Sequence, residues 1–309
     1  MGIPHRPLMQ WCLGLIGAFL LGVLPAQANE PVEASLAEVR VFNLLSQQLQ
    51  PPETLLEKLA QADVVYLGET HDREADHRAQ LEIIQQLLQR RQGWTIGMEM
   101  FQRPYQASLN QFLAGKLDEA ELQARSQYRR RWGYPWEFYA PILRLARARG
   151  VGVIALNAPT EVTRKVARQG LHSLTLAERR FVPPPSAIVL APDRYRQRLR
   201  QLYDEIHQGH GSSLNFDHFF QAQVLWDETM AEAIVQQLQR RPDRSMVVLV
   251  GQGHLLYGDG IPGRVQRRLS QRLGRPLRQV TVLLNPATEL RSQTDVADYF
   301  WDFPSSQQN

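Results

Sequence analysis

Two short turns in this 309-residue chain share one spacing, a glycine followed by a histidine three residues later. They are Gly68 to His71 and Gly251 to His254, and the carboxylate of Glu99 lies between them in sequence. Imidazole and carboxylate groups are suitable protein ligands for zinc, manganese, cobalt and iron. His71, Glu99 and His254 would therefore form a divalent-metal site with open positions, where the metal activates a water for hydrolysis.

Other interpretations of these residues are open at the level of sequence. They also suit hydrogen-bonded side chains at strand ends, or a ligand site without metal, because no short-range pattern such as H-E-x-x-H is present. If the protein is a hydrolase, Glu69 or Asp72 is the candidate general base or the group that orients a histidine. A serine triad has little support, because the chain lacks a G-x-S-x-G motif.

The polar residues follow short apolar runs that are typical of buried strands. These runs cover residues 64–67, 95–98, 151–156 and 246–250. Helical spacing of apolar residues alternates with them, which indicates an α/β fold with a central, largely parallel sheet flanked by helices. Ligands bind such sheets outside the carboxyl ends of the strands. We therefore expect Glu69, His71, Asp72, Glu99, Asn157 and His254 along one edge, with helical excursions over it at 101–150 and 160–240.

The densest aromatic segment, residues 128–139, has arginines beside it and suggests a second chemistry. Tyrosine can ligate haem iron, and nearby cations favour the phenolate form. Tyr134 and Tyr139 are the candidate iron ligands, and Arg131 is a candidate partner for haem propionates. An aromatic helix packed on the core is the alternative interpretation of the same segment.

The first 28 residues have the pattern of a secretory signal peptide. Arg6 supplies a positive start, Cys12 to Leu24 is apolar, and an A-x-A cleavage pattern ends at Ala28. We expect a soluble mature protein from Asn29, in the periplasm or otherwise outside the cytoplasm; an uncleaved anchor is the alternative. Because Cys12 is the only cysteine, the mature chain would contain no disulfide, thiolate nucleophile or cysteine metal site. A net charge of +4 gives no strong case for nucleic-acid binding.

The remaining pattern predicts one α/β domain over 29–309, with its core at about 62–284. Residues 33–50 and 160–180 are predicted to be helical, 215–240 forms a long helix, and 278–284 is the last strand. The tail at 304–309 is predicted to be disordered.

Five motifs together resemble ChaN-type proteins of the haem-binding-uptake and Tiki-like superfamily. They are Y-L-G-E-T-H-D at 66–72, G-M-E-M-F at 97–101, N-A-P at 157–159, A-Q-V-L-W-D-E-T-M-A at 222–231 and G-Q-G-H at 251–254. The resemblance spans roughly Ala62 to Leu284. It implies an envelope protein that binds haem for uptake or buffering, with two cofacial haems between two monomers, each iron held by a tyrosine. Some ChaN-type proteins are lipoproteins, but this signal segment has no suitably placed cysteine.

The paired G-x-x-H turns also resemble the Tiki and TraB branch, which implies a metal-dependent protease. The matching positions are His71, Glu99 and His254, with manganese, cobalt or zinc as the metal. Our leading hypothesis is an exported haem-binding protein that forms a homodimer on haem and has an envelope haem-uptake partner. The metal-dependent hydrolase is the alternative, and an envelope protein with a purely structural cluster is a third.

Overall fold

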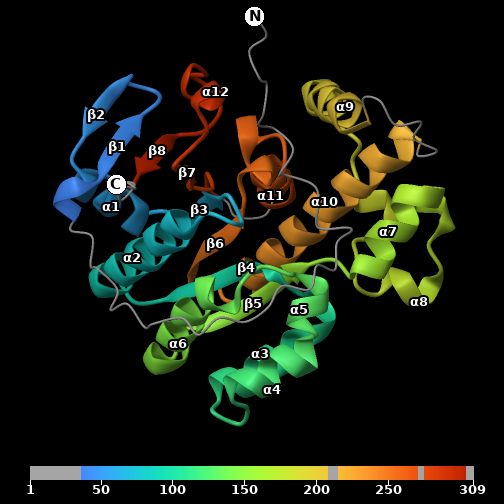
Figure 1. Ribbon diagram of the computed structural model, residues 1–309, viewed down its shortest axis with the longest axis horizontal. Helices are drawn as coiled ribbons and strands as arrows, with labels where there is room; N and C mark the ends of the chain where they lie inside the picture. The colour runs from blue at the N-terminus through green and yellow to red at the C-terminus, as the bar shows by residue number, and fades with distance from the viewer. Residues whose placement is uncertain (1–35, 208–214, 271–274, 304–309) are drawn as a thin grey trace, which may run out of the picture.

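A central sheet with helices on both faces organises the computed structural model (Figure 1). It describes residues 36–207, 215–270 and 275–303. The predicted signal peptide at 1–28 and the predicted tail at 304–309 lie outside these residues.

The described strands form one eight-stranded sheet in the order β2-β1-β8-β7-β3-β6-β4-β5. Their bounds are β1 Arg40–Asn43, β2 Gln48–Gln50, β3 Val64–Glu69, β4 Trp94–Gln102, β5 Gly152–Asn157, β6 Ser245–Gly251, β7 Gln279–Leu284 and β8 Tyr299–Asp302. Neighbouring strands from β8 to β5 are parallel, whereas β1 runs antiparallel to both β8 and β2. The predicted α/β fold with a largely parallel sheet is confirmed.

Helices connect the parallel strands and extend over the carboxyl edge of the sheet. Their bounds are α1 Pro52–Ala60, α2 Glu74–Arg90, α3 Gln106–Leu113, α4 Glu119–Ser126, α5 Tyr128–Arg131, α6 Ala140–Arg149, α7 Thr160–Gln169, α8 Leu176–Arg179, α9 Asp193–His207, α10 Phe216–Arg240, α11 Ile261–Leu269 and α12 Thr288–Arg291. Short 3₁₀ turns are η2 Leu36–Glu38, η3 Arg103–Tyr105, η4 Trp136–Phe138, η5 Leu171–Ser173, η6 Pro185–Ala187, η7 Gln252–His254 and η8 Leu256–Gly258.

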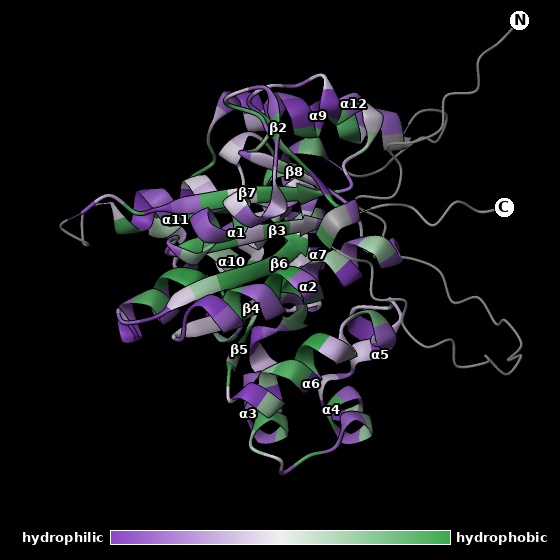
Figure 2. Cartoon of the chain, turned by 90° about the vertical axis from the view of Figure 1, so that its left-hand side faces the viewer, coloured by the Kyte–Doolittle hydropathy of each residue, from purple (hydrophilic) through white to green (hydrophobic). Residues whose placement is uncertain are grey.

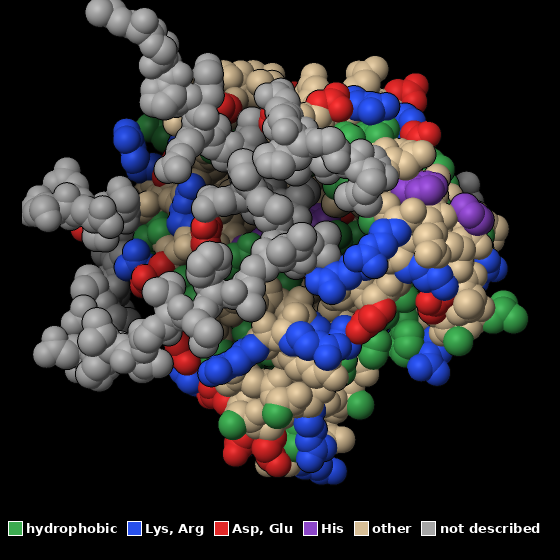
Figure 3. Space-filling view, turned by 45° about the vertical axis from the view of Figure 1, so that its right-hand side comes forward, with side chains coloured by type: hydrophobic (Ala, Val, Ile, Leu, Met, Phe, Trp, Pro, Cys, Tyr) green, Lys and Arg blue, Asp and Glu red, His purple; other side chains and the backbone are tan. Residues whose placement is uncertain are grey.

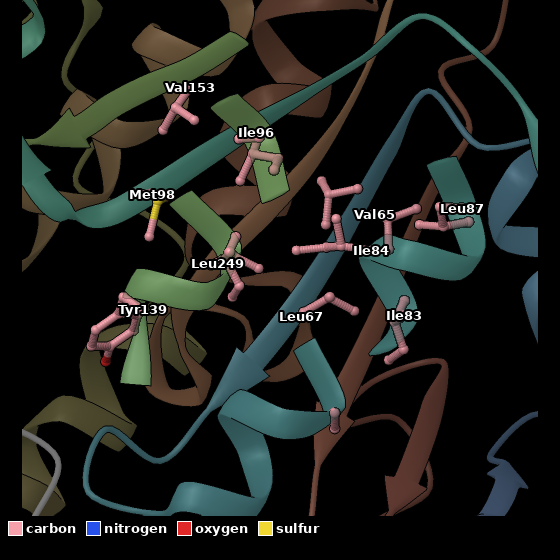
Figure 4. Packing of buried hydrophobic residues seen from close by; sticks show 14 of the residues in the cluster. Val65, Leu67, Ile83, Ile84, Leu87, Ile96, Met98, Tyr139, Val153 and Leu249 are labelled. Carbon is pink, nitrogen blue, oxygen red and sulfur yellow. The ribbon is translucent and has the colours of Figure 1, made fainter. Parts of the chain in front are cut away.

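The central strands are buried on both faces, which explains their nearly continuous apolar sequences. Alternate residues of β3 enter different cores: Val65 and Leu67 pack with α2, whereas Val64 and Tyr66 pack with α10 and α11. Figure 2 shows hydrophobic strands β6 and β7 in the interior of the molecule, and Figure 4 shows Val65 and Leu67 close to Ile84 in the first core. Burying both faces fixes the register of β3 and so the position of the turn that follows it.

The predicted helix over 33–50 is wrong. This segment contains η2 and the hairpin of β1 and β2. The Asn43 side chain accepts hydrogen bonds from the backbone amides of Leu45 and Ser46, which stabilises the turn. Strand β1 is then paired by β8, a segment more than 250 residues later, so a local sequence pattern does not identify it.

The predicted continuous helix over 160–180 is also interrupted. Helix α7 ends at Gln169 because Gly170 has φ +78° and ψ 168°, a conformation that residues with a Cβ rarely adopt. The chain continues as η5 and then as α8, which begins with Thr175 as its cap. The helix predicted at 215–240 is confirmed as α10, with Asn215 capping it.

No helix within the described ranges combines the length and apolar character needed to cross a membrane.

Candidate functional site

The carboxyl ends of three adjacent strands bring the two G-x-x-H turns together. Strand β3 lies between β7 and β6 with Glu69 opposite Gly251, and β6 also pairs with β4, which carries Glu99. A Cβ on Gly251 would lie 2.9 Å from His71 Cε1 and 3.0 Å from its Nε2, so the imidazole packs directly on this backbone. His71, Glu99 and His254 all line one cavity.

The buried carboxylate of Glu69 fixes the orientation of the His71 ring. The His71 Nδ1 atom lies 2.8 Å from Glu69 Oε1, and the hydroxyl of Tyr139 donates to the same oxygen at 2.6 Å. Gln80 donates to the other carboxylate oxygen at 2.7 Å. Burial raises the pKa of Glu69, but its hydrogen bond with His71 and the charges of His77 and His71 outweigh burial and lower it. Glu69 therefore orients an imidazole and does not itself line the cavity.

His254 has a similar support from Asp227 on helix α10. Its Nδ1 atom lies 2.5 Å from Asp227 Oδ1, and Tyr195 donates to Asp227 Oδ2 at 2.6 Å. On the cavity side, His254 Nε2 lies 3.4 Å from Glu99 Oε1, while Glu99 Oε2 accepts the amide of Gly251 at 2.8 Å. Each histidine is thus fixed by a buried carboxylate, and Glu99 lies beside the second one.

The carboxylates favour protonated imidazoles at this site. Burial lowers the pKa of His254, but Glu99 and Asp227 more than offset it and raise the pKa to about 10. Burial likewise lowers the pKa of His71, but the hydrogen bond with Glu69 and the charge of Glu99 raise it. The His254 ring is therefore protonated at neutral pH, and the carboxylates bias His71 towards its protonated form; in that form both ring nitrogens are donors.

A metal ion at His71, Glu99 and His254 would have to displace these protons. No group of three or more His, Cys, Asp or Glu side chains within the described residues has a geometry that could hold a metal ion. The structure brings the three predicted ligands to one cavity, and their role as metal ligands stays a prediction.

The turn that carries His71 is anchored by buried polar side chains. Asp76 accepts the amide of Thr70 at 2.7 Å, and Gln252 donates to the Thr70 hydroxyl at 3.1 Å. The imidazole of His77 hydrogen-bonds the carbonyl of His71 at 3.0 Å. These contacts hold the backbone on both sides of His71, so the imidazole is positioned by its own turn and by the next strand.

The cavity has a volume of about 310 Å³ and an aromatic lining. The ring of His71 lies 4.7 Å from that of Trp132 and 5.0 Å from that of Tyr134. The ring of Trp226 lies 5.2 Å from His254. Side chains of α7, α9 and α10 complete the lining, so the excursion predicted at 160–240 does lie over the strand edge.

The other predicted residues fall in different places. Tyr134 is half-buried and lines the cavity, whereas Tyr139 is fully buried in the core beside Met98 and Leu249 (Figure 4). Arg131 lines the cavity but also binds Glu161 through contacts of 2.8 and 3.0 Å.

Two further placements concern the predicted edge. Asn157 lines the cavity and donates to the carbonyl of Glu99 at 2.8 Å, whereas Asp72 is exposed and does not line it. Asp227, which sequence reasoning did not select, lies on a helix rather than at a strand end. The motif at 222–231 contains it and is the signal that would have identified it.

Known proteins resemble this chain in sequence and in fold. A family described as haem-binding uptake, Tiki superfamily, ChaN matches residues 55–265. A curated relative, Protein RETICULATA-RELATED 5, chloroplastic, of Arabidopsis thaliana, is 29% identical over 265 residues, covering 79% of this chain but only 34% of that protein. The present chain therefore spans about a third of that relative's length.

A solved structure of ChaN of Campylobacter jejuni, which shows cofacial heme binding to that protein, has the same fold with a TM-score of 0.67 and 17% identity. The similarity covers 86% of this chain and 97% of the other. With the family match extending over most of its length and the fold in agreement, the chain belongs to the ChaN family of haem-binding uptake proteins in the Tiki superfamily.

Proposed function

We propose that this protein binds haem in the cavity at the strand edge, with the Tyr134 hydroxyl as the iron ligand. The observation that carries this proposal is the lining: a half-buried tyrosine, two tryptophans and several arginines surround one apolar hollow. Flat aromatic and apolar surfaces suit a porphyrin, guanidinium groups suit its propionates, and a phenol oxygen can ligate its iron.

Tyr134 is a better candidate than Tyr139 for reaching a bound haem. The hydroxyl of Tyr139 already donates to Glu69, and burial together with the Glu69 charge raises its pKa well above the usual value. Burial, Asp72 and Glu99 also raise the pKa of Tyr134, so its hydroxyl is protonated until a cation approaches. Ferric iron would supply that charge and favour the phenolate.

Arg164 is better placed than Arg131 to pair with a propionate. Arg131 forms a two-contact ion pair with Glu161 and donates to Gln102 at 2.8 Å. Arg164 also lines the cavity, is exposed, and makes no ion pair with a described residue. We therefore assign propionate binding to Arg164 first and give Arg131 the role of shaping the wall of the cavity.

We further propose that the protein acts outside the cytoplasm, in haem uptake or buffering. The predicted signal peptide supports export, and family membership supports haem as the ligand. A cavity of about 310 Å³ is at the small end of ligand sites, about 300–1,000 Å³. Part of each haem would protrude, which favours a second copy of the chain covering it in a homodimer. An envelope haem-uptake partner is a further part of this proposal.

Hemin titration followed by absorption spectroscopy tests the haem proposal. We expect a Soret band with high-spin tyrosinate features, and Tyr134→Phe should remove those features and weaken binding. Tyr257→Phe is the matched control, because it removes a tyrosine hydroxyl outside the cavity lining. Binding no stronger than that of an unrelated basic protein would refute the proposal. If the protein binds hemin but Tyr134→Phe leaves the spectrum unchanged, the assigned iron ligand is wrong.

A metal-dependent hydrolase is the second candidate, favoured by one observation. His71 and His254 are each oriented by a buried carboxylate and line the same cavity as Glu99. This arrangement suits ligands or general acids that need a fixed ring orientation. It ranks second because the neighbouring carboxylates raise the pKa of both imidazoles, that of His254 to about 10. A carbonyl-cleaving activity requires an unprotonated imidazole, or a metal-bound water, to act as base.

Metal analysis of the purified protein distinguishes the two candidates. A hydrolase of this type should retain about one divalent ion per chain, and His254→Ala should remove that ion together with peptide or ester hydrolysis. A haem carrier should bind hemin with nearly unchanged affinity in the same variant, because Tyr134 and Arg164 remain. Hydrolysis that persists after metal removal would refute the metal-dependent alternative.

A further inference from the structure

The cavity at the strand edge continues between α7, α9 and α10, where its lining is mostly apolar. Six side chains line this part: Ala158, Ala167 of α7, Leu199 and Leu202 of α9, and Phe219 and Ala222 of α10. We call the space that these six side chains line the apolar chamber. It differs in chemistry from the charged end at His71, Glu99 and His254, although both belong to one cavity of about 310 Å³.

The apolar chamber is lined by members of two separate hydrophobic clusters. Ala158 and Ala222 belong to one cluster, whereas Leu199 belongs to the other, which α9 forms with the first half of α10. Protein interiors are normally close-packed, but alanine side chains are too short to fill the space between these clusters. A cavity lined by apolar side chains binds apolar molecules, because water has no hydrogen-bond partner there.

The charged end supplies hydrogen-bonding groups for a polar head group. The Nδ1 atoms of His71 and His254 lie on buried carboxylates, so the other nitrogen of each ring is the one that can meet a ligand. A protonated imidazole donates to an ether or hydroxyl oxygen, and Glu99 accepts from a hydroxyl. An anionic head group would instead meet the Glu99 carboxylate, whose Oε1 atom lies 3.4 Å from His254 Nε2 and already pairs with it. The head group that fits is therefore neutral.

We propose that this cavity binds a neutral amphipathic lipid with a single alkyl chain. Its head group would lie at His71, Glu99 and His254, and its chain would lie in the apolar chamber. The volume of about 310 Å³ limits the chain to medium length. Each methylene group that leaves water for the chamber should raise the affinity about fourfold. Lipid and haem would exclude each other from the cavity, but lipid binding does not depend on haem binding.

The opposite orientation, with an anionic head group at the mouth of the cavity, fits less well. Arg164 lines the cavity and is exposed. It belongs to α7, on the side of the molecule where basic side chains are visible at the surface (Figure 3). An ion pair at an exposed arginine contributes little by itself. A head group there would also leave the charged groups of the strand edge without a polar partner from the ligand, which is costly for groups shielded from water.

Isothermal titration calorimetry of the haem-free protein with monodecyl glycerol ether, kept below its critical micelle concentration, tests the proposal. We expect one saturable site and a negative heat-capacity change, because the chain becomes buried. Tryptophan emission should shift on binding, since Trp132 and Trp226 line the cavity. The octyl ether, which has two fewer methylene groups, should bind about fifteenfold more weakly.

Variants that fill the apolar chamber locate the chain. Ala167→Leu and Ala222→Leu each place a larger side chain in the chamber and should weaken binding of the decyl ether by about tenfold or more. Ala124→Leu is the matched control, because this exposed alanine of α4 lies outside the cavity lining. Decanoate, which has a similar chain but an anionic head group, should also bind about tenfold more weakly than the ether. Circular dichroism and Tm identify any variant that does not fold.

Three results would overturn the proposal. The first is the absence of saturable binding of the decyl ether to the parent protein. The second is parent-like binding in the folded leucine variants. The third is decanoate binding as tight as that of the ether and lost in Arg164→Ala, which would place an anionic head group at the mouth. Hemin is absent from these experiments, so their failure leaves the haem proposal standing. A protein that binds the ether but not hemin would refute the haem proposal alone.

Discussion

Replacing Tyr139 by phenylalanine tests whether this residue supports His71 or binds haem. Its hydroxyl donates to Glu69 at 2.6 Å, and both side chains are fully buried. Hydrogen bonds to charged groups contribute about 1.5–3 kcal/mol to stability. Because His71 and Gln80 keep their bonds to the same carboxylate, we expect Tyr139→Phe to lower the free energy of unfolding by about that amount. With about 2.1 cal/mol/K of unfolding entropy per residue, Tm should fall by about 2–5 °C.

Thermal and urea denaturation measure this loss, and hemin absorption of the same variant provides the second reading. Tyr139→Phe should retain the tyrosinate features, because Tyr134 is intact. Tyr134→Phe is the reciprocal control: its hydroxyl makes no hydrogen bond with a described residue, so the stability change should be within about 0.5 kcal/mol. A Tyr139→Phe protein that is as stable as the parent but has lost its tyrosinate spectrum would refute this assignment of roles.

Three further outcomes are expected. Burial raises the pKa of Asp76 to about 7, so its contribution to stability is present below about pH 4 and is lost as the pH rises through 7. In urea denaturation, the free energy of unfolding of Asp76→Asn should change less over this pH range than that of the parent, by up to about 4 kcal/mol. Gly251→Ala should displace the His71 ring and cost about 1–3 kcal/mol, unlike Gly152→Ala, whose added Cβ meets its nearest neighbour at 3.8 Å. Intact mass of the exported protein should correspond to a chain that begins at Asn29, without a lipid.

The strand edge was predictable because it depends on local patterns. Apolar runs that end in polar residues define the carboxyl ends of β3, β4 and β6, and parallel pairing follows from strand–helix alternation. Placing Glu69, Glu99 and His254 at one edge required only that these strands be close neighbours. The burial of both sheet faces, visible in sequence as the near-absence of polar residues, kept the register unambiguous.

Other features depend on contacts between distant segments. Strand β1 is stabilised by β8 at the far end of the chain, and its own sequence resembles an amphipathic helix. The motif at 222–231 contains Asp227, but only the packing of α10 against the sheet shows that this residue meets His254. The different positions of Tyr134 and Tyr139 likewise depend on the 3₁₀ turn η4 between them. Tyr134 lies in the cavity wall, whereas Tyr139 lies in the core.

The two ends of the cavity differ in chemistry, and this decides which variants are informative. His254 and Asp227 belong to the charged end at the strand edge, whereas Tyr134 belongs to the aromatic wall. His71 joins the two, because it binds Glu69 and also packs against the rings of Trp132 and Tyr134. Replacing His71 would therefore disturb the proposed haem binding and the acid–base chemistry of the hydrolase alternative together. His254 also packs against one lining ring, Trp226, but the ring that packs on the proposed iron ligand Tyr134 is that of His71. Replacing His254 therefore separates the two chemistries better than replacing His71.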